Sequence, residues 1–318
     1  MKNRLFCGID TSNYTTSLAI VDGEGKVLCN RKQLLPVPSG ACGLRQSDAL
    51  FAHTKALPAM LEEISPLLAE GELSAVGVSV CPRRQEGSYM PCFLAGQAAA
   101  QAMATGAGVP LFSFSHQCGH LMAAVCSAGA FDLLSRPSFL AFHVSGGTTE
   151  MLLAHYDGHG FACEVVGGTA DISAGQLIDR AGVLMGLQFP CGAQMEQLAC
   201  ANTRKLPRMR YTCREGHVNL SGFENKLKEA YEQTRDAAYV SALAMHTVAG
   251  ALASMLSYGF AQYGTMPVLF SGGVMSCAYL KERMGTLCEG HFAPPQYSSD
   301  NAAGIAWLAR AACLKGEN

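Results

Sequence analysis

The sequence predicts an α/β protein made of two related halves, and three observations carry this prediction. Short apolar segments alternate with longer segments of helical periodicity along the chain, a pattern typical of α/β folds. A strand–turn–strand unit occurs twice, once in the first twenty residues and again around residue 145. The 318 residues correspond to about two domains, and a chain of this length buries a sizeable core without disulfides.

The first half is expected to begin with two strands, at residues 5–9 and 17–21, joined by a polar turn. A helix follows over 48–64, and it either kinks or starts anew at Pro58, because proline lacks the amide hydrogen that a helix interior needs. The remaining elements are a buried strand and two helices, at 75–80, 93–104 and 115–127.

The second half repeats the strand–turn–strand unit with strands at 139–144 and 150–154. Helices are expected at 171–185 and 235–263. The last elements are a strand that runs into two glycines, a helix that starts just after them and a closing helix, at 267–270, from Met275 and at 301–314. We expect the two halves to comprise residues 1–108 with 294–318, and residues 109–293 with a helical insertion.

Composition and charge exclude several classes of protein. Hydrophobic residues make up 49% and charged residues 15% of the chain, which excludes extensive disorder. The formal net charge of −2 excludes nucleic-acid binding through bulk charge and leaves only a local basic patch. No apolar run reaches the ~18 residues of a membrane span. The fourteen cysteines are scattered without a CxxC pair, and the N-terminus lacks the pattern of a signal peptide, so a reducing cytoplasm is expected.

The repeated hairpin predicts the fold more closely. The stretch from Asp10 to Ile20 aligns with the stretch from His143 to Leu153, and both contain Ser-x-x-Thr-Thr between two strands. Chance similarity of two polar turns is the alternative explanation. A duplication of this kind is the plan of the actin-like ATPase fold (shared by sugar kinases and heat-shock proteins), in which two ribonuclease-H-like domains face a cleft. Turns rich in Gly, Ser and Thr suit that plan because their amides and hydroxyls bind phosphates.

Two histidines form the sharpest local motif. His116 and His120 stand four residues apart, so a helix places both imidazoles on one face, where they can bind one metal ion. Two structural histidines are the alternative. A zinc protease is excluded, because Gln117 occupies the place of the required glutamate. Asp300 precedes the closing helix and is either its N-cap or a third metal ligand.

Two Gly-Gly turns and one helical aspartate suggest a nucleotide site. Ser145-Gly146-Gly147-Thr148 and Ser271-Gly272-Gly273 each follow a strand, where glycine allows a ligand to approach the backbone. Each turn alone is also an ordinary loop. Asp179 is placed on the helix at 171–185, where it either accepts the ribose hydroxyls of a nucleoside or pairs with Arg180 on the surface.

One basic run stands out in the slightly acidic chain. It comprises Arg204, Lys205, Arg208, Arg210 and Arg214, with Tyr211 among them. Such a run can bind the phosphates of RNA while the aromatic ring stacks on a base. A solvated loop is the alternative.

Taken in order, these segments resemble one family, the universal tRNA threonylcarbamoyltransferases of bacterial TsaD type, once labelled glycoproteases. The similar segments are collinear and extend over nearly the whole chain. They are Gly8-Ile9-Asp10-Thr11-Ser12, His116-x-x-x-His120, Val144-Ser145-Gly146-Gly147, Ala174-Gly175-Gln176-Leu177-Ile178-Asp179-Arg180, Gly186-Leu187-Gln188-Phe189-Pro190-Cys191-Gly192, Ser221-Gly222, Ser271-Gly272-Gly273-Val274 and Ser299-Asp300-Asn301-Ala302.

The resemblance implies an actin-like fold and the transfer of threonylcarbamoyl from its adenylate to N6 of the tRNA adenosine just 3′ of the anticodon. It implies one iron or zinc ion held by His116, His120 and Asp300. It also implies contact with protein partners of the threonylcarbamoylation complex. The residues that match the family's adenylate site are Val144, Ser145, Gly146, Gly147, Thr148, Asp179, Gly192, Gly272, Gly273, Ser276 and Cys277.

The chain departs from the family's pattern at four places. After Thr-Ser the family has Cys, two acidic residues and Thr, whereas this chain has Asn13, Tyr14, Thr15 and Thr16. The histidine of the family's Ser-Gly-Gly-His-Thr turn is replaced by Thr148, its late asparagine by Cys277, and its Gly-Pro-Gly loop by residues 81–87. These changes indicate a diverged paralogue of the catalytic branch, because the non-metal TsaB type lacks the two histidines.

Three functions follow from these observations. The first is a metal-dependent tRNA threonylcarbamoyl transferase, with Asp10 as the nearest candidate for a general base. The second, motivated by the lost acidic pair and the lost turn histidine, is a non-catalytic nucleotide-binding paralogue that regulates or scaffolds the genuine transferase. The third, a small-molecule kinase on the same fold, is disfavoured because the metal-binding residues are retained.

Overall fold

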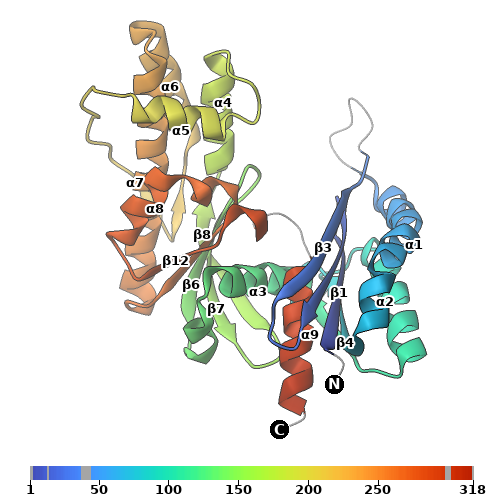
Figure 1. Ribbon diagram of the computed structural model, residues 1–318. Coiled ribbons are helices and arrows are strands. Elements are labelled where there is room, and N and C mark those ends of the chain that lie inside the picture. The colour runs from blue at the N-terminus through green and yellow to red at the C-terminus, as the bar shows by residue number, and fades with distance from the viewer. Residues whose placement is uncertain (1–2, 13, 37–43, 298–301, 317–318) are drawn as a thin grey trace. The chain divides into compact units, whose positions relative to one another are not determined.

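The computed structural model describes residues 3–12, 14–36, 44–297 and 302–316 (Figure 1). These residues form two compact units. Unit 1 consists of Met1–Ser127, Tyr156–Ala162 and Ser299–Asn318, and unit 2 consists of Ala128–His155 and Cys163–Ser298. Compactness therefore groups residues 109–127 with the first unit, while the boundaries of the duplicated halves at 108 and 293 stay a prediction.

The sheet of unit 1 has five strands in the order β3-β2-β1-β4-β5. β1 pairs antiparallel with β2 and parallel with β4, and β4 pairs parallel with β5. Since β1, β4 and β5 run in one direction, their carboxyl ends lie along the same edge of the sheet. The strands are β1 (Arg4–Ser12), β2 (Thr15–Asp22), β3 (Val27–Leu34), β4 (Glu72–Cys81) and β5 (Leu111–Ser115).

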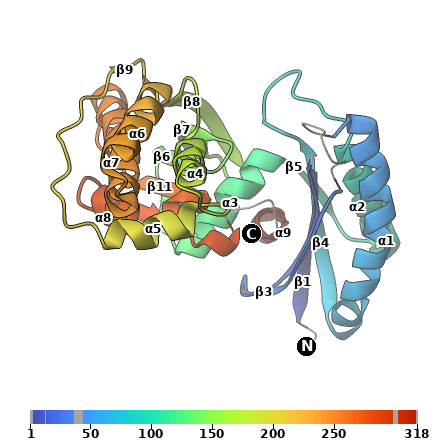
Figure 2. The same cartoon turned by 90° about the horizontal axis from the view of Figure 1, so that it is seen from above.

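Helices cover both faces of this sheet, as Figure 2 shows for α1 and α2 on one face and α9 on the other. On the α1 and α2 side, residues such as Leu18, Ile64 and Val76 form the core of the unit. α1 continues through Pro58 as one helix instead of starting anew there. The helices are α1 (Gln46–Glu70), α2 (Phe93–Ala107), α3 (His116–Ala128) and α9 (Ala303–Gly316).

The sheet of unit 2 repeats the same plan and adds to it. Its order is β12-β11-β6-β7-β8-β10-β9, so the run from β8 to β12 matches the run from β3 to β5 of unit 1. This match confirms the predicted duplication of an α/β half. The strands are β6 (Phe139–Val144), β7 (Thr149–Tyr156), β8 (Phe161–Thr169), β9 (Cys213–Arg214), β10 (His217–Val218), β11 (Val268–Ser271) and β12 (Gly290–Phe292).

The longest helix of unit 2, α7 (Ala237–Tyr263), packs against α5 and forms much of the core together with Leu140, Phe142 and Met151. It is long and apolar enough to cross a membrane, but 72% of its most apolar stretch is buried inside the unit, which is the environment of a core helix. The other helices are α4 (Ala174–Leu184), α5 (Gly192–Cys200), α6 (Ser221–Thr234) and α8 (Ala278–Gly285), with short 3₁₀ turns at Phe131–Ser135, Gly273–Ser276 and Pro295–Tyr297.

The described cysteines form no disulfide bond. Thirteen of the chain's cysteines lie in the described part of the chain, and all thirteen are free thiols. Burial raises the pKa of Cys7 to about 12, so this thiol stays protonated. Cys7 therefore acts as a small apolar side chain in the core of unit 1.

Candidate active site

In unit 1, Asp10 lies near the carboxyl end of β1 and is fully buried. Its Oδ1 accepts a hydrogen bond from the hydroxyl of Ser79 on the neighbouring strand β4. Its Oδ2 lies 2.9 Å from Nδ1 of His116, the first residue of α3, which directly follows β5. The parallel strands β1, β4 and β5 thus bring together three polar side chains that are far apart in the sequence.

His116 and His120 face each other within α3. Their Nε2 atoms are 2.9 Å apart and their rings meet edge to face, with centroids 4.3 Å apart. The carboxylate of Asp10 can only accept, so Nδ1 of His116 carries the proton and Nε2 keeps its lone pair. Two imidazole nitrogens this close need a shared proton or a cation between them.

This geometry fits a metal site. Imidazole nitrogen binds zinc at about 2.0–2.1 Å, so two such ligands at right angles on one ion lie about 3 Å apart. The hydrogen bond from His116 to Asp10 is also the carboxylate support that metal-binding histidines usually have. Asp300, the third ligand predicted from the sequence, lies outside the described residues.

A second group of side chains of the types that bind metals lies in unit 2 and was not singled out by its sequence. Donor atoms of Asp132, Glu289 and His291 lie within 4.8 Å of one another. Both carboxylates are exposed, and Asp132 is 3.9 Å from the guanidinium of Arg136. Exposed groups of this kind are common without an ion, so we assign no metal site to these three residues.

The Gly-Gly turn of unit 2 connects β6 to β7 and is fixed by its own hydroxyls. The amide of Thr148 donates to Oγ of Ser145 at 3.1 Å, and Oγ of Ser173 donates to the carbonyl of Gly146 at 2.7 Å. Ser173 also caps α4 through a reciprocal pair with Gln176. A Cβ on Gly175 would collide with the backbone of Gly146, so the first turn of α4 packs directly on the Gly-Gly turn.

A pocket of about 370 Å³ opens beside this turn, a size within the usual range for small ligands. A neighbouring pocket of about 500 Å³ shares Gly146 and Asp179 with it. Of the residues predicted for the adenylate, six line the first pocket: Gly146, Asp179, Gly192, Gly273, Ser276 and Cys277. Of the other lining residues, Ala193, Glu196 and Met245 lie outside the segments that the sequence singles out.

Asp179 lies where these two pockets meet. Its Oδ1 accepts the amide of Cys191 at 2.8 Å, which fixes the carboxylate at the start of α5. A carboxylate has about four acceptor positions, so capacity remains for further donors. Arg180, the alternative partner considered from the sequence, pairs with Glu224 at 3.0 Å instead.

Two other predicted adenylate residues are not among those that line the pocket. Val144 is fully buried in β6. Gly272 has a φ of 98°, and a Cβ there would collide with the carbonyl of Val144. These residues therefore shape the backbone of the turns. Cys277 does line the pocket, and burial raises the pKa of its thiol to about 11, so it presents a neutral and weakly polar group.

The members of the basic run have different neighbours. Arg204 lies 3.7 Å from the carboxylate of Asp236 and 5.3 Å from the ring centre of Tyr239. Arg208 lines a small pocket of about 170 Å³ together with His246 and Arg283. Arg210 and Arg214 line a different and larger pocket. Lys205 is exposed.

Comparison with known proteins identifies one family. The family TsaD, described as tRNA N6-adenosine threonylcarbamoyltransferase, matches residues 47–307. A tRNA N6-adenosine threonylcarbamoyltransferase of Streptococcus suis (strain 05ZYH33) is 29% identical over 321 residues, covering 97% of this chain and 92% of that protein. One of Methanopyrus kandleri is 28% identical over 309 residues, covering 94% and 85%.

Solved structures show the same fold at low sequence identity. A ROK family glucokinase from Streptomyces griseus matches with a TM-score of 0.53 and 12% identity, over 96% of this chain and 99% of the kinase. HypF of T. kodakarensis matches with a TM-score of 0.56 and 12% identity, over 99% of this chain and 48% of HypF. These similarities confirm the predicted actin-like, sugar-kinase-like fold.

Proposed function

Because the chain belongs to the TsaD family of tRNA N6-adenosine threonylcarbamoyltransferases, we propose that it transfers threonylcarbamoyl from its adenylate to an adenosine of tRNA. The observation that supports this most strongly is the convergence of His116 and His120 on one point, with Asp10 behind them. A sugar kinase does not need that arrangement.

We propose that His116, His120 and Asp300 hold one divalent ion, iron or zinc. When bound, such an ion supplies a Lewis acid that polarises the carbamoyl oxygen and offsets the charge of the adenylate phosphate. Asp10 then acts through His116: it fixes the ring orientation and raises the basicity of Nε2. Both oxygens of Asp10 already have partners, which favours this positioning role over the general-base role considered from the sequence.

In unit 2, the pocket beside the Gly-Gly turn is proposed to bind the adenylate. Asp179 accepts the ribose hydroxyls, Gly146 and Gly273 let the phosphate approach the backbone, and Ser276 offers a hydroxyl. Ile178, Pro190 and Met245 supply apolar surface for the adenine ring. The thiol of Cys277 accepts and donates weakly, so its contact is poorer than that of the amide it replaces in the family's pattern.

The proposed acceptor, tRNA, and the free thiols both suit the cytoplasm, which is the compartment we propose. A biosynthetic context with partner proteins is suggested by relatives named bifunctional tRNA threonylcarbamoyladenosine biosynthesis proteins, one of them from Methanothermobacter thermautotrophicus.

The experiment that tests this function supplies the purified protein with threonylcarbamoyl-adenylate and unmodified tRNA and measures the modified adenosine by mass spectrometry. The wild type is expected to modify tRNA, and His116→Ala is expected to lose activity. His291→Asn, which alters the other metal-binding group, should keep it. A wild type that binds the adenylate and tRNA without modifying the tRNA would replace the transferase by the non-catalytic paralogue.

A further inference from the structure

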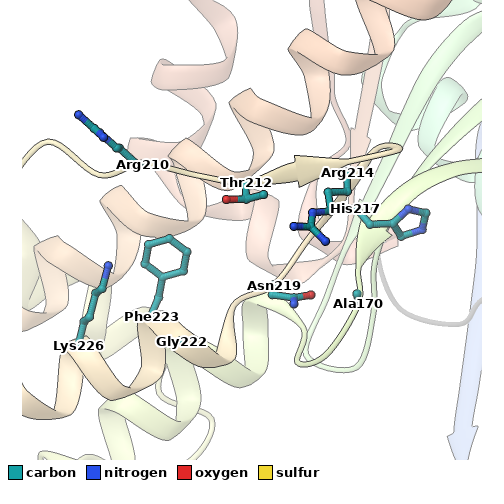
Figure 3. A pocket seen from close by; sticks show the side chains of 9 residues that line it. All are labelled: Ala170, Arg210, Thr212, Arg214, His217, Asn219, Gly222, Phe223 and Lys226. Atoms are coloured by element: carbon teal, nitrogen blue, oxygen red, sulfur yellow. The ribbon is translucent and has the colours of Figure 1, made fainter.

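A pocket of about 640 Å³ lies in unit 2 between a hairpin and a helix. The hairpin, β9 with β10, extends the sheet beyond β8, and the helix is α6. Figure 3 shows their side chains around the pocket. Six polar side chains contribute to its lining, namely Arg210, Thr212, Arg214, His217, Asn219 and Lys226, and the described lining residues include no aspartate or glutamate.

The hairpin holds two of these side chains in place. Arg214 and His217 are directly opposite each other in the β9–β10 pair, so both point to the same face. The two residues between them, Glu215 and Gly216, have φ angles of 50° and 81°, as in a tight two-residue hairpin turn. A Cβ on Gly216 would collide with the carbonyl of Val166, so the hairpin sits directly against β8.

The carboxylate of Asp171 fixes the start of α6, and both of its oxygens already accept hydrogen bonds. Asp171 follows the lining residue Ala170, and it accepts the amides of Leu220 and Ser221 at 2.8 and 2.9 Å. Burial raises its pKa, but these hydrogen bonds outweigh burial and lower the pKa of Asp171 below its usual value. Asp171 therefore holds the helix start as an anion.

Three cations around the pocket have no counter-charge in the described part of the chain. Among residues 3–12, 14–36, 44–297 and 302–316, no carboxylate lies within 4.0 Å of the charged groups of Arg210, Arg214 or Lys226. The ammonium of Lys226 lies 5.0 Å from the ring centre of Phe223, which also lines the pocket. Arg204, from the same basic run, is instead paired with Asp236. Like charges gathered around one hollow favour an anionic ligand.

We propose that this pocket binds backbone phosphates of RNA and is the surface of unit 2 on which the tRNA acceptor docks. The proposal rests on the proposed function, because that reaction requires tRNA. The charges are spread out: in Figure 3, Arg210 and Lys226 lie on one side, and Arg214 and His217 on the other. A line of charges suits successive phosphates better than one small anion. Thr212 and Asn219 offer donors between them, as phosphate and sugar contacts need.

The test compares two triple variants that remove the same charge. The pocket variant is Arg210→Ser, Arg214→Ser and Lys226→Ser. The control variant is Arg204→Ser, Arg208→Ser and Lys228→Ser, which changes two other members of the basic run and an exposed lysine of α6. Binding of an unmodified tRNA transcript is measured between 50 and 200 mM salt. Each lost phosphate contact lowers the slope of log affinity against log salt by about 0.7–0.9, so the pocket variant should flatten it by roughly two units.

The control variant is expected to keep a slope within about one unit of the wild type. Equal flattening in both triples would show that the run acts through general charge and would overturn the proposal. A pocket variant that binds tRNA like the wild type but no longer binds inorganic phosphate or AMP would assign the pocket to a small phosphorylated ligand instead. All six side chains are exposed, and thermal unfolding verifies that both triples fold.

The outcome is separable from that of the proposed function, because tRNA binding is measured without the adenylate. If tRNA binding depends on the pocket but no threonylcarbamoyl is transferred, only the proposed transferase function is contradicted. If the pocket variant transfers threonylcarbamoyl at the wild-type rate when tRNA is limiting, only the proposed docking surface is contradicted.

Discussion

The two sheets carry different side chains at equivalent strand positions. Asp10 of β1 hydrogen-bonds to Ser79 of the parallel neighbour β4. At the equivalent place in unit 2, His143 of β6 lies beside Ser271 of the parallel neighbour β11, with Nδ1 of the imidazole 3.2 Å from Oγ of the serine. The serine partner is thus common to both units, while the central residue is an acid in one and an imidazole in the other.

This difference shows that the duplicated fold determines the position of a side chain but not its chemistry. Strand order and register determine where the central side chain lies. Its chemistry determines the role: a buried carboxylate supports a metal-binding histidine, and an imidazole does not. The residues that follow differ as well, because Thr15 and Ser17 are buried whereas the aligned Thr148 and Glu150 are half-buried.

The largest expected effect concerns metal binding. Replacing His116 by Ala removes one of the two converging nitrogens, so metal content after dialysis should fall to background. Asp10→Asn keeps the shape of the side chain but removes the charge behind His116, and it should weaken metal affinity by about 10–100-fold. Elemental analysis and competition with a chelator measure both effects.

Two control variants sharpen this comparison. His143→Asn changes the equivalent residue of unit 2, and His291→Asn changes the other metal-binding group. Both should keep the metal content of the wild type. A metal content that follows His291 but not His116 would transfer the site to the group with Asp132 and Glu289.

The next effect concerns nucleotide binding in unit 2. Asp179→Asn should weaken AMP binding by about 1.5–3 kcal/mol, since a charged acceptor for hydroxyl groups is lost. Isothermal titration calorimetry measures it. Asp157→Asn, which removes a carboxylate of unit 1 that is paired with Arg84, is the matched control. Unchanged affinity in Asp179→Asn would remove Asp179 from the ribose site.

The local sequence pattern predicted much of this fold. Some of the elements that it missed lack a clear apolar period, and the contacts that it missed depend on strand order. The alternation of strands and helices and the repeated Ser-x-x-Thr-Thr turns predicted the duplicated α/β halves. β3, β5, β8 and β12 were missed, and so were α5 and α6. β3 is half exposed and β12 is only three residues long, so neither has a clear apolar period. The i,i+4 spacing predicted that His116 and His120 meet.

Contacts between distant strands and loops had no local signal. Nothing near His116 indicates that Asp10 supports it, because that contact depends on the order β1-β4-β5. The basic run was predicted either to contact RNA or to be a solvated loop, and its members have different neighbours: Arg204 lies beside Asp236, and Arg208 and Arg214 line two different pockets. Lys226 joins Arg214 at the pocket from helix α6, which lies outside the basic run that the sequence singles out.

A smaller effect concerns the packing of unit 1. In the aligned repeat, Gly8 of β1 corresponds to Ala141 of β6. A Cβ on Gly8 would collide with the backbone of Ala302, just before α9, and of Ala306 within α9, so Gly8→Ala should destabilise the protein by about 1–3 kcal/mol. Denaturant unfolding measures this. Gly106→Ala is the control, because Gly106 lies in α2 with open space around its Cα; it should stabilise by about 0.5–1 kcal/mol. A neutral Gly8→Ala would show that α9 is free to shift away from β1.

The smallest effect is a pH dependence in unit 1. His53 of α1 is fully buried, with Nδ1 at 2.8 Å from the hydroxyl of Thr16. Burial lowers its pKa from the ordinary value and outweighs the opposite influence of Asp10. A pKa lowered in the folded state means that neutral His53 stabilises the folded protein fully above about pH 6.5. This contribution is lost as the pH falls through the folded-state pKa.

The free energy of unfolding should therefore decrease more steeply between pH 6.5 and 5 in the wild type than in His53→Asn. His217→Asn, at an exposed histidine, should keep the wild-type slope. Equal slopes in all three proteins would show that His53 titrates alike in the folded and unfolded chain.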